Sequence, residues 1–543
     1  MEINKIWKRY EKAHDYMQLK GLVTRTNKNW NFYIGNHWEG LESGGEKLPS
    51  LNFIKSVIKY KVATIAQNSM TANYSDFNSD VNMQPVYDIL NNKFSQSWEK
   101  AKMDLNAWQL IKEASIQGDS YALFGTGDTN KPPQILANTS ILLGDENTVK
   151  LQDQPWLIIV ERLELEAVKQ KAKENNLSSE DISSIATDND TTDQLINKDE
   201  VSNKVTSLLY MEKINGIVNI ARATKSCVYE PLRPVETYRG NIVIGGLKSY
   251  PIVPFIWEQK PNSARGVGEV EVLIPNQMEL NKTLARRALT VKLTAYPRLA
   301  YDTNMITNPQ DLDTVGAAIG VNSGGAQSIN QAISYLNATS MSSDAAALLD
   351  DLLSKTKDLA GASEFALGNI NPERASGSAI IAVRDQSQVP LNEQVRSFTQ
   401  FCEDVSLLWF DLWATYDTDS FSYQDENGNT IKLEYEQIMD LKPTVRIDVS
   451  QDNKWTKMAE QQTIDNLLQT QQITFDEYVM LCPANGSVPK GKLEILLDRR
   501  KQVQAKAEEQ QMLQAEQNAQ MQQNTQQTPQ EVPQEALQEP QQQ

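Results

Sequence analysis

Apolar residues recur at helical spacing in three stretches of the first 120 residues, which predicts a mainly helical N-terminal part. The stretches cover residues 2–20, 52–68 and 83–118, and a short aromatic element, residues 30–35, lies between the first two. The third stretch places a broad apolar stripe along one helix face. Packing against other helices explains this stripe without a bound ligand.

After residue 118 the pattern changes to short β-branched and aromatic runs bounded by turn residues, which predicts strands. A charged helix over residues 163–176 and a surface loop over residues 178–192 interrupt them. The section ends in an apolar run, residues 250–257, whose prolines are typical of an edge strand. The other strands are predicted over residues 120–124, 134–136, 156–160, 205–211, 217–220 and 227–229.

Two helices separated by a small insertion are predicted next. The first starts at Pro275 and runs about 30 Å to Ala295, where Tyr296-Pro297 ends it. Residues 298–342 are rich in glycine, asparagine and serine with brief strands, and a second helix covers residues 345–359. A glycine-containing loop, residues 361–377, then leads to a long helix over residues 378–416, which Pro390 should kink.

The remaining chain predicts a hairpin over residues 421–433, a strand over 444–449 and helices over 455–469, 474–480 and 492–510. From residue 511 the chain is rich in glutamine, and such a tail buries too little apolar surface to order itself. The predicted fold class is therefore α+β, mainly α, in several structural units, because 543 residues exceed one compact core.

The net charge of −18 argues against a protein that grips DNA by neutralising its phosphates. A smooth acidic lining would still let a duplex slide past, although solubility alone is the simpler explanation. One cationic cluster stands out: Arg286, Arg287, Lys292 and Arg298. It would either touch phosphate or form salt bridges with a neighbouring acidic helix.

No apolar run reaches the roughly 18 residues of a membrane span, and the charged N-terminus lacks the pattern of a signal peptide. We therefore expect a protein made in the cytoplasm without a membrane span. Cys227, Cys402 and Cys482 lie far apart, which favours buried free thiols over disulfides or a zinc site.

Enzyme motifs are absent or fragmentary. Only two histidines exist; His37 begins a His-x-Glu fragment, but no Pro-Cys-x-x-Cys follows as in zinc deaminases. The phosphate-binding loop of NTPases, the dinucleotide fingerprint and the Gly-x-Ser-x-Gly elbow do not occur. We expect no enzyme, cofactor or metal site. A magnesium-dependent nuclease using Asp311 and Asp313 is the competing hypothesis.

A set of short motifs, in order along nearly the whole chain, resembles the portal proteins of tailed bacteriophages, the family common in phages of Gram-positive hosts. The early motifs are Asn52-Phe53-Ile54-Lys55 and Gly118-Asp119-Ser120-Tyr121. The later ones are Tyr250-Pro251-Ile252-Val253-Pro254-Phe255, Gly266-Val267-Gly268-Glu269-Val270, and Ile274-Pro275-Asn276-Gln277 with Asn281.

The resemblance implies a portal fold with the following parts. A wing covers residues 1–263, stem helices cover 264–295 and 343–360, and a clip covers 296–342 between them. A tunnel loop follows over 361–377, then a kinked long helix over 378–416, β strands completing the wing over 417–453, a crown over 454–510 and a disordered tail over 511–543.

The resemblance also implies the residues of each site. The tunnel loop would present Asn369, Asn371, Glu373 and Arg374 to the DNA backbone, although an ordinary helix connection explains the same residues. The stem would use Gln277, Asn281, Arg286, Arg287 and Lys292, and the clip would dock partners through Asp311, Asp313 and Asn322.

The implied protein is a homo-oligomer, a twelve-subunit ring at one capsid vertex, through which double-stranded DNA passes without being read in sequence. Its partners would be the terminase large subunit, later the head-tail adaptor, and the major capsid and scaffolding proteins. It would reside in the virion, and in the host cytoplasm during assembly. Another head-to-tail adaptor or minor capsid protein is the alternative.

Overall fold

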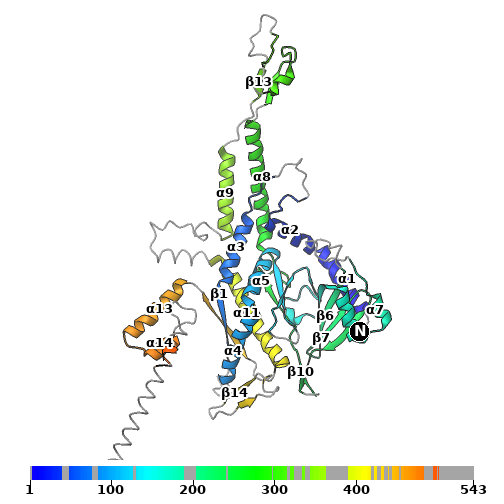
Figure 1. The fold of residues 1–543 in the computed structure, drawn as a ribbon, viewed down its shortest axis with the longest axis vertical. Helices are drawn as coiled ribbons and strands as arrows, with labels where there is room; N and C mark the ends of the chain where they lie inside the picture. The colour runs from blue at the N-terminus through cyan, green and yellow to red at the C-terminus, as the bar shows by residue number, and fades with distance from the viewer. Residues whose placement is uncertain are drawn as a thin grey trace, which may run out of the picture. The chain divides into compact units, whose positions relative to one another are not determined.

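A computed structural model shows an α+β protein (Figure 1). By contacts the chain divides into two compact units, Met1–Ser450 and Gln451–Gln543, which are described separately. The structure describes residues 3–39, 48–75, 84–125, 130–188, 203–239, 242–295, 298–314, 318–322, 333–336, 343–361, 389–417, 421–424, 430–432, 438, 443–451, 454–481, 493, 495–497 and 499.

The N-terminal part is helical, as predicted, with two differences. The predicted aromatic element, residues 30–35, is the end of α2, which Gly35 terminates in the left-handed conformation. The single helix predicted over residues 83–118 is two helices, because Lys102 adopts a positive φ of 49° between them. The helices are α1 (Ile3–Leu19), α2 (Leu22–Ile34), α3 (Phe53–Ala66), α4 (Gln84–Lys100) and α5 (Met103–Gln117).

The predicted strands, together with β4, which was not predicted, build two main antiparallel sheets. The larger has the order β4-β5-β6-β7-β8: β4 (Ile141–Leu143), β5 (Trp156–Glu164), β6 (Lys204–Ile214), β7 (Ile217–Ala223) and β8 (Val228–Pro234). The smaller has the order β11-β2-β3: β11 (Ile252–Ile256), β2 (Asp119–Leu123) and β3 (Gln134–Ala137). The run over residues 250–257 thus forms the edge strand β11, as its prolines predicted.

Smaller elements complete this region. A separate pair, β9 (Glu236–Arg239) and β10 (Ile242–Gly246), forms a two-stranded sheet, and Leu151–Asp153 form a 3₁₀ turn, η2. The charged helix predicted over residues 163–176 is α6 (Leu165–Glu174). The predicted surface loop, however, contains the short helix α7 (Ser179–Ser184), because the Ser178 side chain caps it by accepting from the Asp181 N–H.

The long helix of the second half begins earlier than predicted. Helix α8 spans Glu269–Ala295 and contains Pro275, where the sequence predicted a start. The six residues before Pro275 are helical because contacts of Glu269 and Val270 with the protein body hold the first turn. The predicted insertion contains the antiparallel pair β12 (Arg298–Tyr301) and β13 (Ile333–Leu336) and the 3₁₀ turn η3 (Pro309–Asp313), and α9 (Ser343–Leu359) follows.

Pro390 does not kink a helix. It lies in the 3₁₀ turn η5 (Val389–Leu391), and α11 (Asn392–Tyr416) begins directly after it. A proline lacks the N–H that a helix interior needs but suits the turn before a helix, so the predicted kink at this residue is wrong. Residues 361–377, predicted as a loop, and the predicted helical residues 378–388 lie almost wholly outside the described part.

The last strands of the first unit match the prediction. The hairpin is formed by β14 (Ser422–Gln424) and β15 (Thr430–Lys432), and β16 (Thr444–Gln451) pairs with β1 (Asn68–Ser75). In the second unit, α13 (Lys454–Gln469) and α14 (Phe475–Leu481) pack around Tyr478 and Val479. The predicted helix over residues 492–510 lies mostly, and the glutamine-rich tail wholly, outside the described residues.

Helix α11 is the centre of the main core. The Trp409 ring contacts the rings of Phe94, Phe124 and Trp413, so α11 joins α4 and the residue after β2. Its Asp411 carboxylate accepts hydrogen bonds from the backbone N–H groups of Lys248 and Ser249, while burial raises the pKa of Asp411. The helix is therefore fixed on one side by aromatic packing and on the other by a buried carboxylate.

The cysteines and the apolar character of the helices were both the subject of predictions from the sequence. Cys227 and Cys402 are buried free thiols, as predicted, and burial raises the pKa of each; Cys482 lies outside the described part. Among the described helices, none combines the length and the apolar character that a bilayer-spanning helix needs.

The glycines of the Gly266-Val267-Gly268 motif lie against the segment that joins α5 to β2. A Cβ atom on Gly268 would lie 2.5 Å from the Ile116 carbonyl oxygen, and one on Gly118 would lie 2.7 Å from the Gly266 carbonyl oxygen. Gly118 also has a φ of 108°. Side chains at these positions would push the two backbones apart, which explains the glycines without a nucleotide-binding role.

We predict that Gly268→Ala lowers the free energy of unfolding by about 2 to 3 kcal/mol, because backbone atoms must move to admit the methyl group. Gly320→Ala is the matched control, since the nearest atom to its added Cβ is a threonine hydroxyl at 3.6 Å. Urea unfolding of both variants measures the difference. Equal stability of the two variants would contradict the close contact.

Candidate functional site

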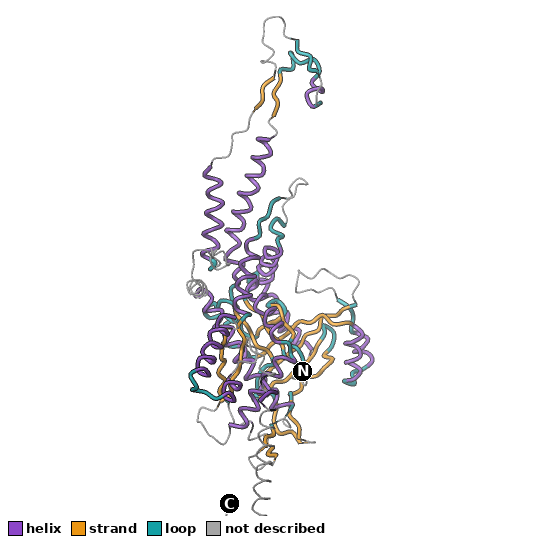
Figure 2. Tube along the Cα trace, turned by 60° about the vertical axis from the view of Figure 1, so that its left-hand side comes forward, coloured by secondary structure: helices purple, strands orange, loops and turns teal. Residues whose placement is uncertain are grey.

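Helices α8 and α9 lie side by side in both views (Figures 1 and 2). Leu280 and Leu349 are buried, and the Asn276 side-chain amide donates a hydrogen bond of 3.1 Å to the Thr356 hydroxyl. Leu284 of α8 and Leu352 and Leu353 of α9 are partly buried against the main core. The pair is thus held by one narrow apolar stripe with a polar contact beside it.

The first half of α8 is anchored in the protein body. The Glu269 carboxylate lies 2.7 Å from the Lys61 ammonium group of α3 and accepts a 3.3 Å hydrogen bond from the Trp257 indole. The Lys61 and Glu269 side chains are only 7% and 15% exposed, so removing one would leave the other charge buried without its partner. Val270, next to Glu269, and Leu273, about one turn further along the helix, are both buried.

Gln277 and Asn281 form a chain of buried hydrogen bonds one and two turns further along α8. Gln277 accepts from the Phe53 N–H and donates to the Leu51 carbonyl and to the Asn281 side-chain oxygen, at 3.2, 2.7 and 3.0 Å. Asn281 donates in turn to His37 Nδ1 at 2.8 Å. The two predicted stem residues therefore fasten α8 to the segment between α2 and α3.

The same series of hydrogen bonds fixes the tautomer of His37. Its Nε2 lies 2.9 Å from the Phe32 carbonyl oxygen and must carry the proton, so Nδ1 accepts from Asn281. Burial lowers the pKa of His37, although its two hydrogen-bond partners oppose the shift. A second proton on Nδ1 would face the Asn281 NH₂ group, and turning that amide would break its bond with Gln277.

The second half of α8 has a different surface. From Arg286 to Ala295 nearly every described side chain is exposed, including Leu289 at 57% and Val291 at 62%. On α9, Leu348 is 55% exposed. The single chain thus leaves large apolar side chains of both helices in water, although it buries the residues at their seam.

The predicted basic residues lie on this exposed half. Arg286 is 3.7 Å from Glu279 of its own helix, with both side chains largely exposed, so this ion pair contributes little stability. Arg287 and Lys292 are also exposed. On α9 the Asp351 carboxylate pairs with Lys355 at 2.6 Å. Each helix therefore carries exposed charges of both signs.

The remaining predicted site residues are only partly described. Asp311 and Asp313 belong to η3, but their side chains lie outside the described part, whereas Asn322 is exposed and its N–H donates to the Met305 carbonyl. The tunnel-loop residues Asn369, Asn371, Glu373 and Arg374 lie outside the described residues. Among the predicted site residues whose side chains are described, Gln277 and Asn281 contact each other.

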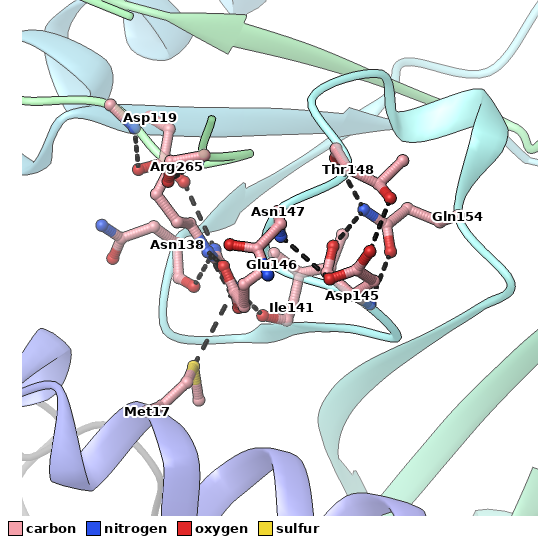
Figure 3. Close-up of polar contacts among 12 residues, drawn as sticks. Met17, Asp119, Asn138, Ile141, Asp145, Glu146, Asn147, Thr148, Gln154 and Arg265 are labelled. Carbon is pink, nitrogen blue, oxygen red and sulfur yellow. Dashed lines mark hydrogen bonds and ion pairs between the residues drawn. The ribbon is translucent and has the colours of Figure 1, made fainter. Parts of the chain in front are cut away.

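Sequence reasoning missed the most connected polar residue, Arg265 (Figure 3). Its guanidinium lies 3.3 Å from Asp119 and 3.1 Å from Glu146, and it donates to the carbonyls of Asn138 and Ile141, at 2.8 Å each. Burial alone would lower the pKa of Arg265, but Tyr121, Glu146 and Asp119 together raise it. An arginine directly before the Gly-x-Gly motif was the available signal.

Carboxylates and histidines do not gather for metal binding in the described part of the chain, where no group of three or more His, Cys, Asp or Glu side chains is placed to hold an ion. The contacts of Glu269 and Arg265 are instead those of buried ion pairs that join elements. The polar groups described so far therefore position α8.

The sequence profile of the phage P22-like portal protein family matches residues 7–543. This chain belongs to the P22-like portal protein family. Portal proteins are ring-forming structural proteins of the bacteriophage virion, so the expected resemblance to phage portals is confirmed. The Gram-positive host range that the resemblance implied stays a prediction.

Two further comparisons accompany this match. Among curated proteins, none matches the portal chain in sequence. Among solved structures, it is similar to a chain of a "Virion of native gene transfer agent (GTA) particle", with 10% identity and a TM-score of 0.36 over 84% of this chain and 92% of the other. The family match alone supports the assignment.

We predict that this portal protein loses stability as the pH falls below about 6.5, the ordinary pKa of histidine. The unfolded chain takes up a proton on His37 at a higher pH than the folded chain, so acid favours unfolding, by at most about 1.4 kcal/mol per pH unit for one group. Urea unfolding between pH 7 and 5 should show that the free energy of unfolding depends less on pH in His37→Gln than in His14→Gln. Identical slopes would contradict the neutral buried histidine.

Proposed function

We propose that this protein forms the portal ring at one capsid vertex, through which double-stranded DNA is packaged and ejected. The observation that carries the proposal beyond family membership is the α8–α9 pair, anchored at one end and covered with exposed apolar side chains at the other. A monomer gains nothing from such a surface, whereas a ring covers it with copies of itself.

In this proposal α8 and α9 are the stem, within residues 264–295 and 343–360. Residues 1–263 and 417–453 are the wing, 296–342 the clip, 361–377 the tunnel loop, 378–416 the long helix, and 454–510 the crown. The antiparallel pair β12–β13 between α8 and α9 supports a clip that is a small folded insertion. Residues 511–543 form the glutamine-rich tail.

Neighbouring stems would make both apolar and ionic contacts. Leu289 and Val291 of one subunit would pack on α9 of the next, and Arg286 with Arg287 would lie against Asp350 and Asp351 there. The ionic half of this interface favours salt bridges between subunits over phosphate contacts for the basic cluster. A net charge of −18 in each subunit then suits a channel through which DNA slides.

The ring would be passive, with packaging driven by ATP that a separate terminase hydrolyses. Twelve subunits, as the portal resemblance implies, would surround a duplex contacted through Asn369, Asn371, Glu373 and Arg374. The clip, with Asp311, Asp313 and Asn322, would dock the terminase large subunit and later the head-tail adaptor. Major capsid and scaffolding proteins would surround the wing during assembly in the host cytoplasm.

A different head-to-tail adaptor or minor capsid protein is the second candidate, and electron microscopy of the purified protein separates the two. The proposal expects closed rings of about twelve subunits with a central hole wide enough for duplex DNA. A stable monomer under assembly conditions, or a ring with a closed centre, would reject it.

Magnesium-dependent DNA cleavage that Asp311→Ala abolished would instead support a nuclease.

We predict that Leu289→Asp with Val291→Asp prevents ring formation, because two carboxylates would be buried between stems without partners. Mass photometry should then show mainly monomers. Leu19→Asp is the matched control, since Leu19 is 83% exposed on α1, away from the stem, and this variant should still form rings. Rings that persist in the double variant would show that this face does not join subunits.

We predict that Asn371→Ala with Arg374→Ala spares ring assembly but impairs DNA packaging, because the tunnel loop would lose backbone contacts with the duplex. Packaged DNA per particle, measured by nuclease protection, should fall while mass photometry still shows rings. Leu19→Asp, at an exposed position with no proposed contact to DNA or partners, serves as the control for both assembly and packaging. Loss of rings in the double variant would assign the loop to contacts between subunits.

A further inference from the structure

A small basic pocket lies where α1 ends and α2 begins. Its volume is about 250 Å³, and the loop before α8 lines its other side. Four of its lining side chains are cationic, whereas Glu146 is the only acid among the described lining residues. The four are Lys20, Arg25, Lys260 and Arg265. Such a concentration of positive charge stands out in a chain whose net charge is −18.

The four cations are not equally engaged. Arg265 is fully occupied by the carboxylates and carbonyls of its cluster (Figure 3), and Arg25 lies 3.5 Å from Glu271 of α8. Lys20 lies over the Tyr16 ring at 5.5 Å, which leaves its ammonium protons unused. Within the described part of the chain, neither Lys20 nor Lys260 lies within ion-pair distance of a carboxylate.

The donors around the pocket come from different directions. Lys20 follows the last turn of α1, Arg25 belongs to α2 and Lys260 to the loop between β11 and α8. Gly21, between the two helices, has a φ of 67° and no side chain that could cap α2, and Leu22 at the first turn lines the pocket. Cationic side chains therefore reach the cavity from three segments of the chain.

We propose that this pocket binds an oxyanion of the phosphate class, held by Lys20 and Lys260 with Arg25 beside them. A tetrahedral oxyanion accepts hydrogen bonds in several directions at once, which matches donors on three segments better than a planar carboxylate does. The volume suits one such group. The phosphate would come either from a nucleic-acid backbone or from free phosphate, and both present the same chemistry to the pocket.

Occupation of the pocket would tie the end of α1 to the loop before α8. Lys260 lies five residues before Arg265, whose guanidinium contacts β2 and the segment after β4, and Arg25 contacts Glu271 in the first turns of α8. The bound anion would thus reinforce the joint at which α8 leaves the protein body. The exposed stem residues Leu289 and Val291 do not line this pocket, so the site does not depend on the proposed function.

Isothermal titration of the purified full-length protein with inorganic phosphate, at low ionic strength and neutral pH, tests the site. We expect saturable binding that Lys20→Gln with Lys260→Gln weakens at least about tenfold, because two charge-assisted contacts are lost. Lys28→Gln is the matched control: Lys28 is exposed on α2 outside the pocket and should leave the affinity unchanged. Thermal unfolding without phosphate verifies that each variant is folded.

A second arm identifies the source of the phosphate. A short DNA duplex that competes with inorganic phosphate, through the same two lysines, would place a nucleic-acid backbone in the pocket, whereas phosphate binding without competition would assign a free anion. Undetectable phosphate binding, or equal affinity in the double variant and Lys28→Gln, would overturn the proposal. A glutamate-rich peptide that bound through the same two lysines more tightly than inorganic phosphate would also overturn the proposal, in favour of an acidic protein segment.

Discussion

The structure depends on the close approach of two backbone segments, residues 116–118 and 266–268. Only glycines allow this distance, because a Cβ at Gly268 would lie 2.5 Å from a carbonyl oxygen. On one side of the contact Arg265 binds Asp119 and Glu146, and on the other Glu269 binds Lys61. Buried ion pairs with both partners present thus surround a contact that tolerates no side chain.

This arrangement explains why α8 can be both fixed and exposed. Its first three turns are held by the Glu269 ion pair and by the Gln277–Asn281–His37 hydrogen bonds, which demand one orientation of the helix. From Arg286 onward, nearly every described side chain of the helix faces water in the single chain. A rigid anchor therefore presents an apolar surface at a fixed angle, which a ring of identical subunits requires.

Much of the fold could be predicted from the sequence, because the spacing of apolar residues and the presence of turn residues are local signals. The strands and the edge position of β11 were predictable from β-branched runs and prolines, and Gly118 marked a true helix end. The wrong start of α8 at Pro275 arose where a long-range contact decides, because nothing near Glu269 in sequence indicates its pairing with Lys61. The Arg265 cluster was missed for the same reason, since its partners lie more than a hundred residues away.

The outer edge of β11, where the Gln152 side chain donates to the Ile252 carbonyl, bears on how copies of this chain can meet. Hydrogen bonds from the Trp257 N–H to Gly118 and from the Phe124 N–H to Pro251 show that odd-numbered residues of the strand face β2, so Pro254 faces outward. Because Pro254 has no N–H, a strand that paired with this edge would lack one backbone hydrogen bond. In a ring of such subunits, Pro254 would hinder edge-to-edge pairing of the sheets into an open-ended fibre.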